Sequence, residues 1–216
     1  LVKLRWTPRE GHKEYVQLKW GDVREMSHET YLGLTDSDFA FNPLMRYAGS
    51  SEDVMEVAAQ QMSLTHSLQR GQWDWETCIY RNAVERNWYK LDRLRDSTGT
   101  FWSLSASLSG DGDSFDAVGL LNGRNSIGLE QLELKANNRS YHSMGIQHRG
   151  GWNFQVGQRN DWRFTYGLRV HRDGVDRFEW RDGYAMHEGM MQLVASGTPG
   201  TAGNRLDGAE AFAGYA

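Results

Sequence analysis

The sequence predicts a protein of the α+β class that is mainly β, with about eight short antiparallel strands in a β-meander, as a sandwich or a barrel, preceded by two amphipathic helices. Apolar residues alternate with polar ones through much of residues 100–196, and turn-forming dipeptides recur there every 9–15 residues. A helix-like spacing of apolar residues precedes this region. We expect one compact domain with a mixed N-terminal region (1–99), the meander (100–196) and a C-terminal loop or tail (197–216).

The N-terminal region should hold one strand and two helices. Residues Tyr15–Trp20 alternate between apolar and polar, which is typical of a strand. Ser50 and Ser51, followed by acidic residues, resemble a helix cap, and Gly71 marks the end of that first helix. A second apolar stripe of helical spacing runs from about Trp75 to Arg95.

From Thr100 the apolar period becomes two, and dipeptides that favour positive φ in tight turns punctuate the chain. These dipeptides predict hairpin turns at residues 111–112, 122–123, 137–138, 150–151, 160–161, 173–174 and 182–183. The intervals leave room for one short strand each, which gives the expected count of about eight.

Arginines gather on one predicted face of the meander. Between Arg139 and Arg181 there are eight arginines, no lysine and four acidic residues. Alternation puts most of them on the same side of their strands as several amide side chains. The candidate ligand-binding residues are Arg149, Arg163, Arg169, Arg177, Arg181, Gln147, Gln155 and Asn153.

The planar fork of arginine suits carboxylate, sulfate or phosphate, and amides between such forks suit sugar hydroxyls. We therefore expect a non-enzymatic protein that acts by binding or assembly, with an anionic or polyhydroxy ligand such as a glycan. An ordinary solvated sheet face is the plainer interpretation. A structural subunit of a large assembly, such as a virion or phage tail, or a homo-oligomer is an alternative.

Two further alternatives follow from residue types. The mixture of Arg, Gln, His and Tyr resembles the sheet face of jelly-roll polysaccharide lyases. That resemblance implies His171 or His148 as the base and Tyr141 as the acid in proton transfer from a uronate. The alternation of Trp162–Val170 is also typical of lipid-facing strands, but the expected helices and the Gly-Tyr-Ala ending count against a small outer-membrane barrel.

Composition excludes several classes. A net charge of −4 argues against general nucleic-acid binding, and the single Cys78 excludes an internal disulfide or a thiolate metal cluster. No apolar stretch predicts a transmembrane helix, and the compartment stays open. We expect no cofactor, and the weak candidates for a metal site are Asp111, Asp113 and Asp116, with a hairpin turn as the alternative. The same-face pair His142 and His148 is another weak candidate.

Overall fold

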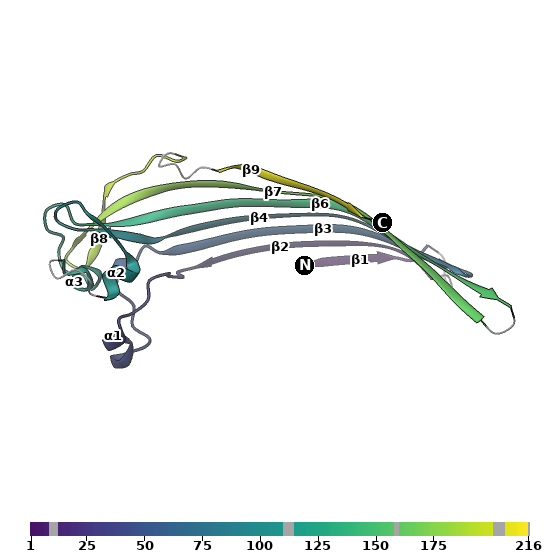
Figure 1. Cartoon of the computed structure of the whole chain (residues 1–216), viewed down its shortest axis with the longest axis horizontal. Coiled ribbons are helices and arrows are strands. Elements are labelled where there is room, and N and C mark those ends of the chain that lie inside the picture. The colour runs from purple at the N-terminus through teal and green to yellow at the C-terminus, as the bar shows by residue number, and fades with distance from the viewer. Residues whose placement is uncertain (9–12, 110–114, 158–159, 201–205, 216) are drawn as a thin grey trace.

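The computed structural model describes residues 1–8, 13–109, 115–157, 160–200 and 206–215, with the backbone alone for residues 160 and 206–215. Its main feature is one antiparallel sheet of long strands that arch away from a small helical cap (Figure 1). The described strands form an open, half-barrel-like sheet. The mainly β, antiparallel character predicted from the sequence is confirmed, whereas the sheet neither closes into a barrel nor stacks as a sandwich within the described residues.

The sheet order is β1-β2-β3-β4-β6-β7-β8, with β5 pairing β4 and β9 pairing the outer edge of β7. The strands are β1 (Val2–Trp6), β2 (Lys13–Ser27), β3 (Val54–Arg70), β4 (Trp73–Arg95), β5 (Phe101–Ser103), β6 (Gln131–Val156), β7 (Asn160–His187), β8 (Met190–Ala195) and β9 (Leu206–Tyr215). The helices are α1 (Asp36–Phe41), the 3-10 turn η1 (Ala48–Ser50), α2 (Leu104–Ser109) and α3 (Ala117–Leu121). None of these helices has the length and hydropathy needed to cross a membrane.

The strand predicted at Tyr15–Trp20 lies within β2, but the two long helices are not present. Residues 54–70 and 73–95 are the strands β3 and β4, which pair with each other over their whole common length. Apolar residues of β3 recur four apart, at Val54, Ala58 and Met62. Because four is an even number, this spacing keeps residues on one face of a strand as well as on one side of a helix.

The count of short strands in residues 100–196 is also wrong. Residues 137–138, 150–151, 173–174 and 182–183 lie inside β6 and β7, which pair from Leu132–Tyr184 to Val156–Asn160. The described parts of Phe101–Leu121 hold β5 and two short helices, while the turn predicted at residues 111–112 lies outside the described residues. The alternation continues on both sides of each of these dipeptides, so the backbone stays extended through them.

The C-terminal segment is the other departure from the sequence interpretation. Residues 206–215, expected to be part of a loop or tail, form β9, which pairs antiparallel with β7 from Arg169–Tyr215 to Arg177–Leu206. This strand covers the outer edge of the middle of β7, while β8 covers the end nearer the cap.

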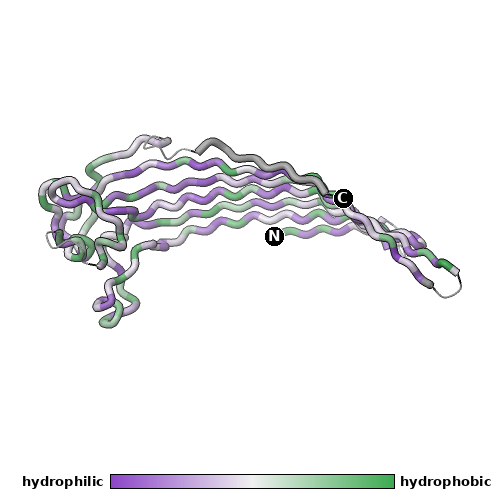
Figure 2. Tube along the Cα trace, in the orientation of Figure 1, coloured by the Kyte–Doolittle hydropathy of each residue, from purple (hydrophilic) through white to green (hydrophobic). Residues whose placement is uncertain are grey.

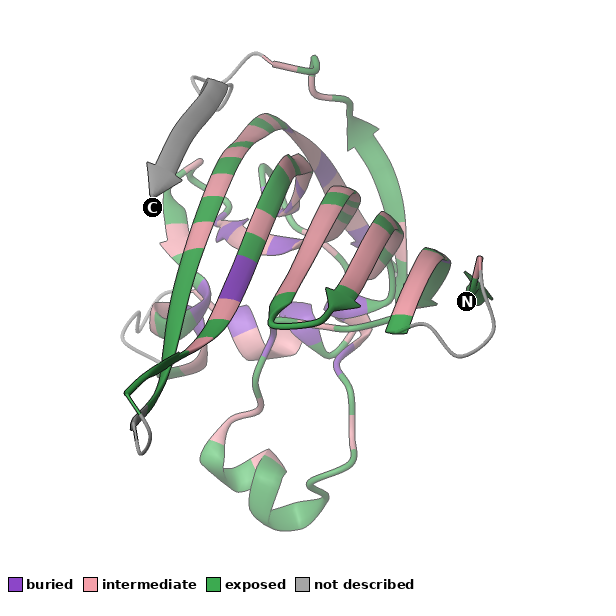
Figure 3. Cartoon of the chain, turned by 90° about the vertical axis from the view of Figure 1, so that its right-hand side faces the viewer, coloured by how far each residue is buried: buried purple, intermediate pink, exposed green. Residues whose placement is uncertain are grey.

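Among the described residues, the buried apolar core lies at the cap end. It joins Leu91 and Leu94 of β4 to Leu132 and Leu134 of β6, and the helices cover them with Leu104, Leu120 and Leu121. Buried residues gather around the helices in Figure 3, while the long strands are mostly exposed or half-buried. The rest of the sheet is a single layer, so what lies on its two faces decides what the protein can contact.

Replacing Leu134 should cost far more stability than replacing an apolar residue of the single-layer part. Leu134 is 0% exposed in the cap core. We expect Leu134→Ala to lower the free energy of unfolding by about 3 kcal/mol, because it leaves a cavity. Urea unfolding followed by tryptophan fluorescence measures the difference.

The matched control is Ile79→Ala, because Ile79 is 52% exposed. Its expected cost is below about 1 kcal/mol. Equal losses for the two variants would contradict the placement of the core at the cap.

Candidate functional site

The register of the long strands sorts their side chains onto two faces. Residues paired directly across neighbouring strands share a face, and successive residues alternate. In β3, β4, β6 and β7 one such row joins Thr65, Cys78, Gln147 and Arg169, and the next joins Leu64, Ile79, Ile146 and Val170. The first row belongs to what we call the polar face and the second to the apolar face. Figure 2 shows the resulting alternation along each strand.

All eight candidate ligand-binding residues lie on the polar face. Pairing of β6 with β7 places Arg149, Gln147, Asn153 and Gln155 in the same set of rows as the arginines of β7. Asn153 is directly opposite Arg163 and accepts a hydrogen bond from it at 3.1 Å. The structure therefore brings these residues onto one surface, which extends from the row of Gln155 to the row of Arg181.

Two acidic residues of β4 form ion pairs with two arginines near the β6–β7 hairpin turn. Arg163 donates from Nη2 to both carboxylate oxygens of Asp74, at 2.8 and 3.0 Å. The Arg149 guanidinium lies 3.2 Å from Glu76. Neither carboxylate was a sequence-predicted site residue, because the segment carrying them was interpreted as a helix.

Nearer the cap, the buried carboxylate of Glu179 forms ion pairs with two cationic side chains. Glu179 is 1% exposed and pairs with Arg177 at 2.6 Å and with Lys135 at 3.2 Å. Burial by itself raises the pKa of Glu179, but hydrogen bonds and ion pairs with Arg177 and Lys135 outweigh burial and hold the pKa below its usual value. Arg181 is held in the same way by Asp92, at 3.0 Å.

A tyrosine missed by the sequence analysis lies in the middle of the polar face. The Tyr80 hydroxyl shares a hydrogen bond with Nδ1 of His171 at 2.7 Å and accepts another from Nε of Arg169 at 3.1 Å. Nε2 of His171 lies 3.7 Å from Asp173. The pairing of β4 with β6 and of β6 with β7 creates this cluster, with the ring of Tyr80 passing over Gly145.

The residues considered for lyase-like catalysis do not come together. His148 is on the apolar face, where it hydrogen-bonds Thr77 and Tyr166. Tyr141 is on the polar face but pairs with Val175, whereas His171 pairs with Gly145, four positions along the strand. Four strand positions correspond to roughly 13 Å. Tyr80, rather than Tyr141, is the phenol beside His171.

The metal candidates remain without support. Asp111 and Asp113 lie outside the described residues. Asp116 caps α3 by accepting from Gly119 N at 2.9 Å, and it pairs with Arg124 at 3.1 Å. His142 and His148 share a face but lie six positions apart, roughly 20 Å along the strand. In the described part of the chain, no group of three His, Cys, Asp or Glu side chains could hold a metal ion.

Comparisons of the chain with protein-family models, with curated proteins and with solved structures each found no match.

Glu179 gives a pH-dependent prediction. Because its pKa in the folded protein is below the usual value of 4.5, its ionised form stabilises the fold above that pH, and this contribution is lost as the pH falls. We expect Glu179→Gln to lower the free energy of unfolding by about 2 kcal/mol at neutral pH, because Arg177 and Lys135 lose their anionic partner.

The difference between Glu179→Gln and the unaltered protein should shrink as the pH falls below 4.5 and through the lowered pKa of Glu179, because the native carboxyl then also becomes protonated. Denaturant unfolding at a series of pH values measures it. A difference that does not change with pH would mean that Glu179 acts through packing alone.

Proposed function

We propose that this chain is a non-enzymatic protein that acts by binding or assembly, and that its polar face receives anionic or polyhydroxy ligands such as acidic glycans. The observation that supports the proposal most is the placement of five arginines and three amides on one surface of the β6–β7 hairpin. Guanidinium forks with amides between them match alternating anionic and hydroxyl groups.

The charge balance of the polar face favours anions. Within residues 74–93, 133–155 and 161–181, the cations on this face outnumber the carboxylates. The cations are Arg86, Lys90, Arg93, Lys135, Arg139, Arg149, Arg163, Arg169, Arg177 and Arg181. The carboxylates are Asp74, Glu76, Asp92, Glu133, Asp161, Asp173 and Glu179. The chain as a whole is acidic, so this excess is local.

The ion pairs do not prevent binding. The side chains of Arg149 and Arg163 remain 74% and 49% exposed although each touches a carboxylate. A guanidinium has five N–H donors, so one carboxylate leaves donors for a ligand. Its pairing also holds the fork in place, which reduces the entropy lost on binding.

A structural subunit of a larger assembly is the second candidate. The apolar face opposite carries large exposed side chains on every long strand, among them Leu64, Ile79 and Val170. Contiguous apolar surface of this extent is normally covered by a partner or another phase. A homo-oligomer, or a larger body built from this chain, would cover it.

A lyase-like enzyme for acidic glycans is the third candidate. Its support is the Tyr80–His171–Arg169 cluster, in which an imidazole and a guanidinium both lie within hydrogen-bond distance of the Tyr80 hydroxyl. Loss of uronate cleavage in Tyr80→Phe would be its test.

Arg149→Ala should weaken binding of a sulfated polysaccharide such as heparin. We expect about a fivefold higher Kd at low salt, because one charge-assisted contact is lost. Isothermal titration calorimetry at two salt concentrations measures the Kd, which should rise with salt as screening increases.

Arg24→Ala is the matched control, because Arg24 is an exposed arginine on the other face of the sheet. Its Kd should change less than about twofold. Equal effects of the two substitutions would show attraction by net charge alone, and no binding at low salt would reject the anionic ligand.

A further inference from the structure

The apolar face of the sheet carries a continuous apolar band between the cap and the hairpin turns. Each strand contributes alternate residues to it. The band comprises Val2, Leu4 and Trp6 of β1; Val16, Leu18 and Trp20 of β2; Met62, Leu64 and Leu68 of β3; Trp73, Trp75 and Ile79 of β4; Met144, Ile146, Trp152 and Phe154 of β6; and Trp162, Phe164, Tyr166, Leu168 and Val170 of β7.

In the middle of the sheet the band is more exposed than the polar face behind it. In β3, Met62 and Leu64 are 53% and 43% exposed, whereas the polar-face residue between them, Ser63, is half-buried. In β4, Ile79 is exposed between the half-buried Cys78 and Tyr80. In water, an arrangement with the apolar side chains buried would be favoured, because each Å² of exposed apolar area costs about 25 cal/mol. In the middle of the sheet, the apolar side chains are therefore more exposed than the hydrogen-bonded side chains of the polar face.

The height of the band matches the hydrocarbon layer of a bilayer. It occupies residues 144–154 of β6 and 162–170 of β7. Ten steps of roughly 3.3 Å cover about 33 Å along β6. For a strand tilted by about 40° from the bilayer normal, this length spans about 25 Å along the normal. A strand that crosses a membrane needs about 9–11 residues.

Aromatic residues border the band at its hairpin end. Trp73 stacks on Trp152 at 5.0 Å between ring centroids, and Trp152 contacts Phe154 at 4.7 Å. Trp162 and Phe164 are 58% and 57% exposed beside them. Amphipathic aromatic rings concentrate at the interface between hydrocarbon and lipid headgroups.

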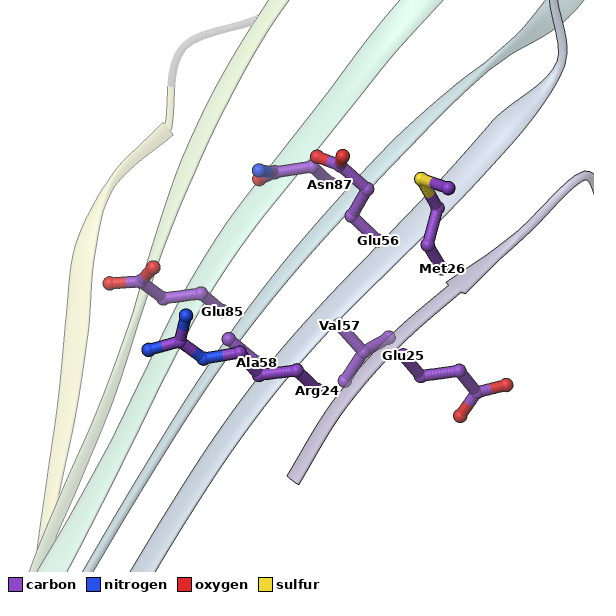
Figure 4. Close-up of a pocket in the computed structure, with 8 residues that line it drawn as sticks. All are labelled: Arg24, Glu25, Met26, Glu56, Val57, Ala58, Glu85 and Asn87. Atoms are coloured by element: carbon purple, nitrogen blue, oxygen red, sulfur yellow. The ribbon is translucent and has the colours of Figure 1, made fainter. Parts of the chain in front are cut away.

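Charged residues border the band at its cap end. Arg81 and Arg172 occupy the row of Trp20 and Met62. Four residues further along the strands lie Arg24, Ala58 and Glu85, followed by Glu56 and Asn87 (Figure 4). Arginine can keep its stem in an apolar layer while its guanidinium reaches the polar boundary.

The band also shifts along the strands across the sheet. In β2 it runs from Trp20 to Val16 and ends at Glu14. In β7 the row of Trp20 holds Arg172, and the apolar residues run from Val170 to Trp162, further towards the hairpin turn. The hairpin-end edge of the band thus advances towards the hairpin turn from β2 to β7, as is expected when strands tilt through a flat layer.

Polar groups inside the band are paired with one another. His148 shares hydrogen bonds with Thr77 at 2.7 Å and with Tyr166 at 3.0 Å, and the Tyr166 ring covers Gly150. His66 lies 3.3 Å from Glu14. Pairing of this kind lowers the cost of placing polar side chains in hydrocarbon.

We propose that the apolar band contacts the acyl chains of a lipid bilayer, so that β6 and β7 cross the membrane and the shorter apolar stretches of β2, β3 and β4 lie in the same layer, with the polar face turned away from lipid. This inference does not rest on the proposed ligand of the polar face. A bilayer accounts for the height of the band in β6 and β7 and for the two borders, neither of which packing against a second copy requires. Unpaired backbone is not tolerated in hydrocarbon, so further strands must pair with the free sheet edges there.

Site-specific labelling tests the proposal in vesicles of palmitoyl-oleoyl-phosphatidylcholine. In a Cys78→Ser background, Ile146→Cys and Gln147→Cys give neighbouring labelling sites on the apolar and polar faces of β6. Each variant is labelled with an environment-sensitive dye and refolded into vesicles that contain lipid with a nitroxide in the middle of its acyl chain. We expect the dye at residue 146 to be quenched at least threefold more than the dye at residue 147.

The unlabelled protein provides a second readout. Its tryptophan fluorescence should be quenched more by a nitroxide next to the headgroup than by one in mid-chain, because Trp73, Trp152 and Trp162 lie at the aromatic border and Trp20 lies at the opposite edge of the band. Equal quenching at residues 146 and 147, or failure of the intact chain to float with the vesicles, would overturn the proposal. A discrete oligomer that shields the dye at residue 146 without lipid would assign the band to a second copy.

Discussion

The structure depends on the uninterrupted pairing of β4, β6 and β7. This register runs from Leu132–Tyr184 to Val156–Asn160 between β6 and β7, and from Arg95–Gln131 to Trp73–Trp152 between β4 and β6, with one irregularity at Leu91/Arg93. Because side chains alternate at every step, a slip of one residue would exchange the two faces. The helical cap sets this register at one end, where Leu91, Leu94, Leu132 and Leu134 pack under the helices.

Beyond the cap, the described part of the chain places no second layer over either face of the sheet. On the polar face, charged side chains therefore pair with one another: Arg163 with Asp74, Arg149 with Glu76 and Arg177 with Glu179. The other face presents Leu64, Ile79 and Val170 outward. These two arrangements together favour a sheet that lies between water and an apolar phase, with the polar face towards water and the apolar face towards the apolar phase.

The sequence predicted the antiparallel class and the common face of the candidate residues in β6 and β7, because alternation along the strands indicates both. It did not predict strand length, since Asp173–Gly174 and Gly150–Gly151 favour turns locally but lie in β7 and β6 under long-range pairing. It took β3 and β4 for helices because a spacing of four fits both structures. Asp74, Glu76 and Tyr80, which complete the polar face, were therefore missed.

Cross-linking between β4 and β6 tests the register most directly. In a Cys78→Ser background, Ile79→Cys combined with Ile146→Cys places two thiols on a directly opposed pair, and Ile79→Cys with Gln147→Cys places them on opposite faces. A short thiol-specific cross-linker should join residues 79 and 146 in most molecules and leave residues 79 and 147 largely unlinked. Preferential linkage of residues 79 and 147 would mean that the register is shifted and that the two faces are not those described.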